Sequence, residues 1–252
     1  MKNIFSIVFI IFCITFASQV LAEEKLTVCY KAYYFIPLGE ACIEYSFDSD
    51  KIKISSYIKT NTLISLIKRI DDKGYSLIGL KRGVYHFKFF QREGDYKRDH
   101  IYTYSRKNLN YKIIKFKKGK GYIKKGVVNK KYIFDPYFYT LNLQCGLYKN
   151  YFQLFYDKKT YKIPINETKG EGYRIIRLKP DIKTSGLLVP KGYWWIFVNK
   201  DMMMDRIWVE FTIGRAKLRS VSVEGDRSLI KKICDKLIKY NKYDSSVVND
   251  AN

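Results

Sequence analysis

Most of the chain alternates between polar and apolar residues, and one stretch in its middle, 134–146, departs from that alternation. There Asp135 can cap the free N–H groups of a first helical turn, and Pro136 has the backbone angle that suits the first helical position. Gly146 can adopt the left-handed conformation that commonly ends a helix. Four residues between them recur at helical spacing, namely Phe138, Leu141, Asn142 and Cys145. The sequence therefore predicts a mid-chain helix with a β-rich half of the chain on each side.

The two halves are predicted to consist of short strands, because apolar residues recur at every second position between turn-forming residues. The predicted strands are 26–35, 40–47, 51–59, 84–91, 100–106, 111–117, 122–129, 151–157, 160–166, 172–178, 193–199, 206–213 and 217–223. The strand 193–199 is apolar on both faces, which is typical of a central strand covered on both sides. The segment 63–70 has a helix-like period that Ile64 interrupts, so its structure stays open, and 72–74 is predicted to be a turn.

The last apolar pattern predicts an amphipathic C-terminal helix, which Asp226 or Ser228 would cap. Its apolar positions are Ile230, Ile233, Cys234, Leu237 and Ile238. Many short strands with two helices indicate a mainly β fold, either a strongly curved antiparallel sheet or an incomplete β-barrel that wraps the mid-chain helix. We expect one β-rich domain over 23–252, whose two β halves meet near 134–147.

The first 22 residues have the pattern of a signal peptide. Lys2 precedes an apolar run, 4–16, that is too short to cross a membrane comfortably, and Val20-Leu21-Ala22 places small or apolar residues at a cleavage site. Cleavage after Ala22 would leave Glu23 first in a mature chain located in the periplasm. An uncleaved anchor is the alternative, and no lipid anchor or later membrane-spanning segment is expected.

Export changes the interpretation of the cysteines. Loss of the leader would leave Cys29, Cys42, Cys145 and Cys234, an even number in an oxidising compartment, with three ways of pairing. Cys29 and Cys42 flank the turn 36–39 and are both predicted to face outward from a hairpin, so a disulfide between them is sterically plausible. Cys145 and Cys234 each fall on the apolar stripe of a predicted helix, and we expect them to be buried free thiols.

The chain has 252 residues and a formal charge of +23, to which the predicted leader contributes only Lys2. A field of this sign favours anionic partners, such as phospholipid or lipopolysaccharide headgroups, anionic glycans or nucleic acid. Export argues against nucleic acid. The alternative is that lysine is simply the common surface residue of this chain, because runs of charge are usually solvated faces.

Catalytic chemistry has little support in the sequence. The two histidines, His86 and His100, fall at outward or ambiguous strand positions with no carboxylate or cysteine motif nearby, and both are interpreted as surface residues. The nucleophile elbow, the zinc-binding His pair and the phosphate loop are all absent. Met202-Met203-Met204 could suit a soft metal but is interpreted as a turn. We therefore predict no catalytic residue, no metal ligand and no cofactor.

Aromatic and cationic residues interleave along several predicted strands. Such a surface suits an amphipathic anionic ligand, because aromatic rings contact acyl chains or sugar faces while cations meet phosphates. The candidate ligand-binding residues are Arg174, Arg177, Lys179, Trp194 and Trp195. The alternative is that the aromatic residues form the core and the lysines its solvated rim.

The order of several short motifs resembles the bacterial exported proteins grouped as domain of unknown function 3108, over nearly all of the predicted mature chain. The motifs are Tyr30 with Ile36-Pro37-Leu38-Gly39-Glu40-Ala41, then Tyr57-Ile58-Lys59-Thr60, Asp135-Pro136 with Leu141, Lys159 with Tyr161, and Trp195 with Asp201 and the strand pair that follows. The chain departs from the family pattern at Tyr137-Phe138-Tyr139 and Met202-Met203-Met204. The resemblance implies a periplasmic β-rich protein of Gram-negative type with no established reaction, similar in architecture to half-barrel carriers of lipoproteins.

Together these observations predict a non-enzymatic periplasmic protein that binds or carries an amphipathic anionic component of the cell envelope. That component could be a lipid, a lipoprotein acyl chain or lipopolysaccharide, and peripheral membrane contact or an envelope protein partner is compatible with this interpretation. One alternative is a structural module that assembles through a sheet edge. A hydrolase that uses scattered carboxylates is the third hypothesis.

Overall fold

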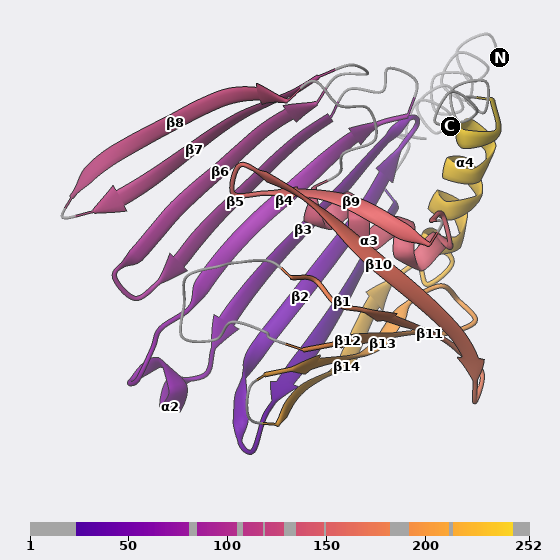
Figure 1. Ribbon diagram of the computed structural model, residues 1–252. Helices are drawn as coiled ribbons and strands as arrows, with labels where there is room; N and C mark the ends of the chain where they lie inside the picture. The colour runs from indigo at the N-terminus through magenta and orange to yellow at the C-terminus, as the bar shows by residue number, and fades with distance from the viewer. Residues whose placement is uncertain are drawn as a thin grey trace, which may run out of the picture.

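The structure is a computed structural model (Figure 1), and it describes residues 24–80, 85–104, 108–117, 119–128, 135–148, 150–181, 192–211 and 214–243. The predicted signal peptide therefore lies outside the described residues. The described chain forms one antiparallel sheet of 14 strands, in the order β8-β7-β6-β5-β4-β3-β2-β1-β14-β13-β12-β11-β10-β9. Two meanders, β1 to β8 and β9 to β14, thus join where the first strand pairs with the last.

The strands are β1 (Glu24–Tyr33), β2 (Pro37–Asp48), β3 (Lys51–Thr60), β4 (Asp71–Gly79), β5 (Tyr85–Glu93), β6 (Tyr96–Tyr104), β7 (Leu109–Lys117), β8 (Lys120–Val128), β9 (Tyr151–Tyr156), β10 (Lys159–Gly170), β11 (Tyr173–Leu178), β12 (Trp194–Val198), β13 (Met204–Glu210) and β14 (Arg215–Gly225). The helices are α2 (Thr62–Ser65), α3 (Pro136–Cys145) and α4 (Leu229–Tyr243). This confirms the predicted fold class, a curved antiparallel sheet with a mid-chain helix and a C-terminal helix.

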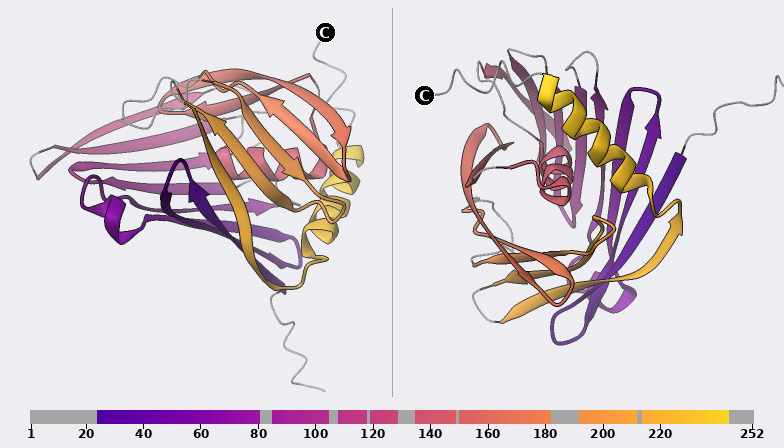
Figure 2. Two further views of the ribbon diagram at one scale, coloured as in Figure 1. Left: turned by 90° about the horizontal axis from the view of Figure 1, so that it is seen from below. Right: turned by 90° about the vertical axis from the view of Figure 1, so that its right-hand side faces the viewer.

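Helix α3 lies inside the curve of the sheet (Figure 2, right). The Asp135 carboxylate accepts hydrogen bonds from the backbone N–H groups of Tyr137 and Phe138, and Gly146 ends the helix with a φ of 70°. Its buried residues surround the helix axis instead of forming one stripe: Tyr139, Leu141, Asn142, Leu143, Gln144 and Cys145. A helix that is buried on nearly all sides belongs to the core of the protein, not to its surface.

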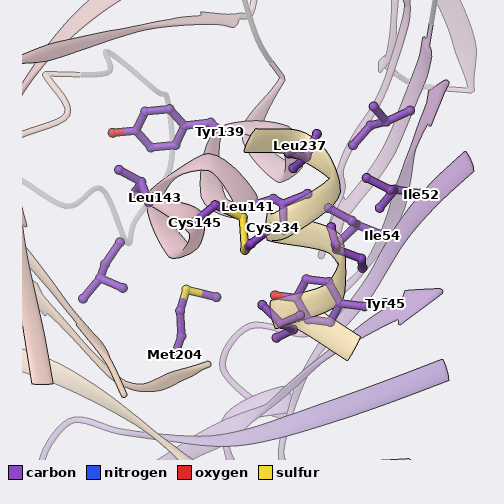
Figure 3. Close-up of a cluster of buried hydrophobic side chains, with 14 of the residues drawn as sticks. Tyr45, Ile52, Ile54, Tyr139, Leu141, Leu143, Cys145, Met204, Cys234 and Leu237 are labelled. Carbon is purple, nitrogen blue, oxygen red and sulfur yellow. A yellow bond between two sulfur atoms is a disulfide. The ribbon is translucent and has the colours of Figure 1, made fainter. Parts of the chain in front are cut away.

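Helix α4 crosses one open end of the curved sheet, beside α3 (Figure 2). Its apolar stripe is buried, as the sequence predicts, while Lys231, Lys232, Lys236 and Lys239 face outward. Cys145 of α3 and Cys234 of α4 form a disulfide in the middle of the hydrophobic core (Figure 3). The expectation that these two cysteines are free thiols is therefore wrong: the two apolar stripes on which they lie face each other.

Cys29 and Cys42 are direct cross-strand partners in the β1–β2 ladder, and they too form a disulfide. Both side chains lie on the outer face, because their inner-facing neighbours Val28 and Tyr30 belong to the core. The Tyr57 hydroxyl lies 3.0 Å from the Cys42 sulfur and covers it.

The prediction of a turn at 72–74 is wrong, because these residues lie within β4. A Cβ atom at Gly74 would come within 2.6 Å of the Tyr137 hydroxyl oxygen and 2.7 Å of the Lys88 carbonyl oxygen. The glycine thus allows α3 to approach the sheet closely, and it does not mark a chain reversal. In the ambiguous segment 63–70, the first three residues belong to the short helix α2, which Asn61 caps, and Ile70 forms an isolated β-bridge with Glu93.

Side-chain contacts, not backbone hydrogen bonds, hold the edge strand β9 against β6 and β7 near the other edge of the sheet. Phe155 of β9 packs on Tyr102 and Tyr111, with ring centroids 5.1 and 5.3 Å apart. Just beyond β9, Asp157 forms an ion pair with Arg98 of β6 at 2.9 Å. Strand β9 is therefore a buried edge, and the sheet resembles a barrel without being closed by a strand ladder.

A candidate ligand-binding face on strands β11 to β14

The outer face of β11, β12, β13 and the loop before β12 carries a row of aromatic rings. Trp195 and Trp208 are cross-strand partners, and Phe197 packs against Trp208 with centroids 4.6 Å apart. Tyr193 extends the row beyond Trp195 at 5.9 Å, and Tyr173 extends it beyond Phe197 at 6.3 Å. We call this row and the cations that border it the outer aromatic face.

Arginine and lysine side chains lie on these rings. The guanidinium of Arg177 is 4.0 Å from the Tyr193 centroid, and that of Arg215 is 4.3 Å from the Trp195 centroid. Further contacts on this face join Arg206 to Tyr173 and Phe197, Lys179 to Tyr193, and both Arg215 and Lys217 to Trp208. Cation–π contact orients a cation while leaving its N–H groups free to bind an anion.

Carboxylates neutralise only part of this face. Arg206 pairs with Asp205 and Arg215 pairs with Glu210, each at 3.2 Å. Within the described residues, no ion pair joins Arg177, Lys179 or Lys217 to a carboxylate, so these positive charges remain available to a ligand. The face therefore combines oriented cations with half-buried aromatic surface.

The five predicted ligand-binding residues divide between the two faces of the sheet. Arg177, Lys179 and Trp195 belong to the outer aromatic face. Side chains alternate between the two faces along a strand. Arg174 is three positions from the outward-facing Arg177, and Trp194 is one position from the outward-facing Trp195, so both point to the inner face. The structure thus brings three of the five together.

Arg174 holds the end of α3. Its guanidinium donates hydrogen bonds to the backbone carbonyls of Leu143 and Gln144, and its Nη1 lies 3.3 Å from the Glu167 carboxylate. A cation at the C-terminal end of a helix is favourable, because the last carbonyls have no partner within the helix. Trp194 packs against the hydrophobic core. Both residues thus have clear structural roles.

A cleft of about 500 Å³ lies between the β10–β11 and β12–β13 turns, where Arg174 and Val198 of the inner face and Tyr173 of the outer aromatic face all line it. Its charged lining residues are Lys169, Glu171, Arg174 and Lys200, and Tyr173 belongs to both the cleft and the aromatic row. The cleft is open and mostly cationic, so it can extend the area over which an anionic ligand contacts this end of the molecule.

The interpretation of His100 as a surface residue is wrong. The side chain is fully buried on the inner face of β6, where its ring stacks on Tyr156 at 5.0 Å. Its Nδ1 lies 3.0 Å from the Tyr102 hydroxyl, and Nε2 has no hydrogen-bond partner within the described residues. Burial, together with the positive charge of Arg98, lowers the pKa of His100 to about 3. The imidazole is therefore neutral and packs as an aromatic ring, whereas His86 is exposed.

Two carboxyl groups inside the curve of the sheet have raised pKa values. Burial raises the pKa of Asp135 to about 6 and that of Asp72 to about 6. Each has a structural partner, since Asp135 caps α3 and accepts from the Ser76 hydroxyl, while Asp72 accepts from the Arg92 backbone N–H. These bonds explain both residues without a reaction.

Within the described ranges, His, Cys, Asp and Glu form no cluster of three or more that could hold a metal ion. In the same ranges, no helix is both long enough and apolar enough to span a membrane.

Several residues of the outer aromatic face were not predicted: Tyr173, Tyr193, Phe197, Arg206, Trp208, Arg215 and Lys217. Their alternation with apolar residues was visible in the sequence. What was missing was the strand register, which alone places Trp208 opposite Trp195. The strand 193–199 was expected to be covered on both faces, yet in the described residues its outer face is covered by side chains of arginine and lysine.

Comparison with known proteins supports a β-barrel-like class of fold. A solved structure with this architecture is a beta-barrel-like protein of the domain of unknown function DUF1849 from Brucella abortus. The match has a TM-score of 0.54 and 7% sequence identity, and it covers 81% of this chain and 98% of the other. At this identity the similarity concerns the fold alone. No model of a protein family matches the chain, and no curated protein matches it.

Proposed function

We propose that this protein binds an amphipathic anionic component of the cell envelope without transforming it. The observation that carries the proposal is the outer aromatic face, on which Arg177 and Lys179 lie over an aromatic ring and have no carboxylate partner among the described residues. Cations can bind phosphate or carboxylate groups, while the rings beside them contact apolar or sugar surface.

The hydrophobic core that the described residues form favours binding at the surface over carriage inside the sheet. Side chains of α3, α4 and β9 pack with the inner face into one hydrophobic core. Figure 3 shows the part of this core around α3 and α4. The largest fully buried side chains of that core include Tyr30, Tyr45, Tyr102 and Phe155. An acyl chain would have to displace these contacts, whereas the outer aromatic face is already accessible.

A location outside the cytoplasm is part of the same proposal. Two disulfides are typical of proteins in an oxidising compartment and are compatible with export to the periplasm. Membership of the domain of unknown function 3108 family is likewise proposed, since the structural comparison supports only the coarser β-barrel-like class.

Tryptophan fluorescence can test the proposal, because two of the three tryptophans, Trp195 and Trp208, lie on the outer aromatic face. Dodecyl phosphate, titrated below its critical micelle concentration, should change the emission and bind saturably. The variant R177Q/K179Q should bind at least about 10-fold more weakly, because it removes two charges that no carboxylate neutralises.

The matched control is K231Q/K236Q on the exposed side of α4, which removes the same charge far from the aromatic row. Equal weakening in both variants would contradict the proposed site and indicate a net-charge effect. Native mass spectrometry of protein purified from the envelope adds a second criterion, since protein that is always free of ligand would argue against the function itself.

A further inference from the structure

The hairpin formed by β7 and β8 is a second cationic surface, separate from the outer aromatic face. The two strands contain six lysines and no aspartate or glutamate. The hairpin ends at the far left of Figure 1, away from α3 and α4. In sequence, the whole stretch 101–134 has eleven lysine and arginine residues and no acidic residue. Almost half of the formal charge of +23 is thus concentrated in about one eighth of the chain.

Lysines on this hairpin face each other directly. Lys112 of β7 is the cross-strand partner of Lys125 of β8. Like charges in directly opposite positions destabilise a strand pair. A few lysines on an edge strand are enough to prevent edge-to-edge association. Protection of the edge therefore does not by itself explain six lysines without a single compensating carboxylate.

Apolar side chains accompany the lysines on the same strand. Tyr122, Ile123 and Val127 are 53%, 54% and 58% exposed, and Lys120, Lys124 and Lys125 are exposed between and beside them. Because side chains alternate, Tyr122 and Lys124 lie on one face of β8 while Ile123, Lys125 and Val127 lie on the other. Both faces of the strand therefore offer cations together with apolar surface.

We propose that the β7–β8 hairpin docks on an anionic phospholipid membrane surface. Lysines near such a surface are attracted to the headgroups, and the exposed apolar side chains can enter the boundary between headgroups and acyl chains. The open edge of β8 limits the depth of contact, because its unpaired N–H and C=O groups need water or headgroup oxygens and cannot enter the hydrocarbon layer. Charge alone would also suit a nucleic acid or an acidic glycan, but neither has an apolar layer for Ile123 and Val127.

The test is co-sedimentation of the full chain with vesicles of phosphatidylcholine containing 30% phosphatidylglycerol, compared with vesicles of pure phosphatidylcholine. We expect binding to the anionic vesicles only, and weaker binding as salt is added. At about 1 kcal/mol per lysine, K120Q/K124Q/K125Q should bind about 100-fold more weakly. The matched control is K231Q/K236Q/K239Q, which removes three exposed charges from α4 and should bind within about threefold of the unchanged protein.

A second variant, I123S/V127S, retains every lysine and tests the apolar part of the contact. It should bind the anionic vesicles about 10-fold more weakly, because both side chains lose apolar area that would be removed from water. Equal loss in the two triple-lysine variants would overturn the proposal. So would tighter binding to heparin or a DNA oligonucleotide that the serine substitutions leave unchanged, since the partner would then be an anionic polymer.

Failure of membrane docking by the hairpin can be distinguished from failure of the proposed function at the outer aromatic face. The hairpin variants should bind dodecyl phosphate normally, and R177Q/K179Q should still sediment with anionic vesicles. Loss of both activities in either variant would mean that the two surfaces are not independent, and would overturn the assignment of the hairpin as a separate site.

Discussion

The two edges of the sheet, β8 and β9, protect their unpaired backbone groups in opposite ways. Strand β9 is folded against the inner face of β6 and β7, where Leu154 and Phe155 are buried. Strand β8 remains in solvent, and the side chains from Lys120 to Lys125 are exposed on both faces. An exposed edge is a template for association unless it is covered or charged. The edge at β9 is covered by the core, and the edge at β8 carries lysines. Stability therefore depends on β9, and surface interactions depend on β8.

The largest expected effect is loss of the covalent support behind β9. Helix α3 packs against β9 and is joined to α4 by the Cys145–Cys234 disulfide, whose cysteines are 89 residues apart. The loop-entropy relation predicts that C145A/C234A lowers the free energy of unfolding by between about 4 and 5 kcal/mol. C29A/C42A, which opens a loop of only 13 residues, should cost about 3 kcal/mol. Urea denaturation measures both, and the reverse order would contradict this role of α3.

Next in size is removal of the ion pair that anchors the β9–β10 turn. The Arg98 side chain is only 7% exposed, so D157N would leave a buried guanidinium without its carboxylate. We expect a loss of about 3 kcal/mol of stability by urea denaturation. Asparagine tolerates the positive φ of 43° at this position, so the turn itself is preserved. D48N, at the exposed end of β2, should stay within about 0.5 kcal/mol, and an equal effect would refute the anchoring role of Asp157.

His100 should make the covered edge sensitive to acid. Because the folded pKa is lowered to about 3, its contribution to stability is complete above the unfolded pKa of about 6.5 and is lost as pH falls toward 3. Between pH 7 and pH 5 the loss is about 2 kcal/mol. H100F cannot titrate, so its stability should fall by about 2 kcal/mol less than that of the unchanged protein over this range.

The comparison between the two proteins isolates His100 from the other titrating groups. Asp72 and Asp135 act in the opposite direction, since their raised pKa values add stability as pH falls, but they are present in both proteins. Arg98, Asp157 and Lys115, which contribute to the field at the imidazole, are also unchanged. Parallel pH profiles in urea denaturation would show that folding does not lower the pKa of His100.

The smallest effect is expected at the charged edge. K125E converts the pair with Lys112 from like to opposite charges, which should raise the free energy of unfolding by about 0.5 kcal/mol. A gain in stability from an acidic residue would mean that the lysines of β8 oppose folding slightly. Destabilisation by more than 1 kcal/mol would instead indicate a structural role for Lys125 and weaken the contrast between the two edges.

Local patterns predicted much of the fold because they depend on short stretches of chain. The cap at Asp135, the ending at Gly146 and the stripe of α4 are each contained within a few residues, and all three have the expected roles. Gly74 was wrongly predicted to lie in a turn. A glycine is needed there because Tyr137, which is distant in sequence, approaches the backbone closely. The ligand-binding candidates were chosen by residue type, so three fell on the outer aromatic face, whereas Arg174 and Trp194 belong to the inner face.

By itself, the sequence determined that this chain forms a curved β-sheet around a buried helix, because alternation and helix capping are local properties of the backbone. Only the tertiary structure decided that the cysteines of α3 and α4 meet, that His100 is buried, and which aromatic rings align across strands. Those outcomes depend on strand register and on the return of β9 to the inner face of β6. Both are set by contacts between residues far apart in sequence, which no local pattern encodes.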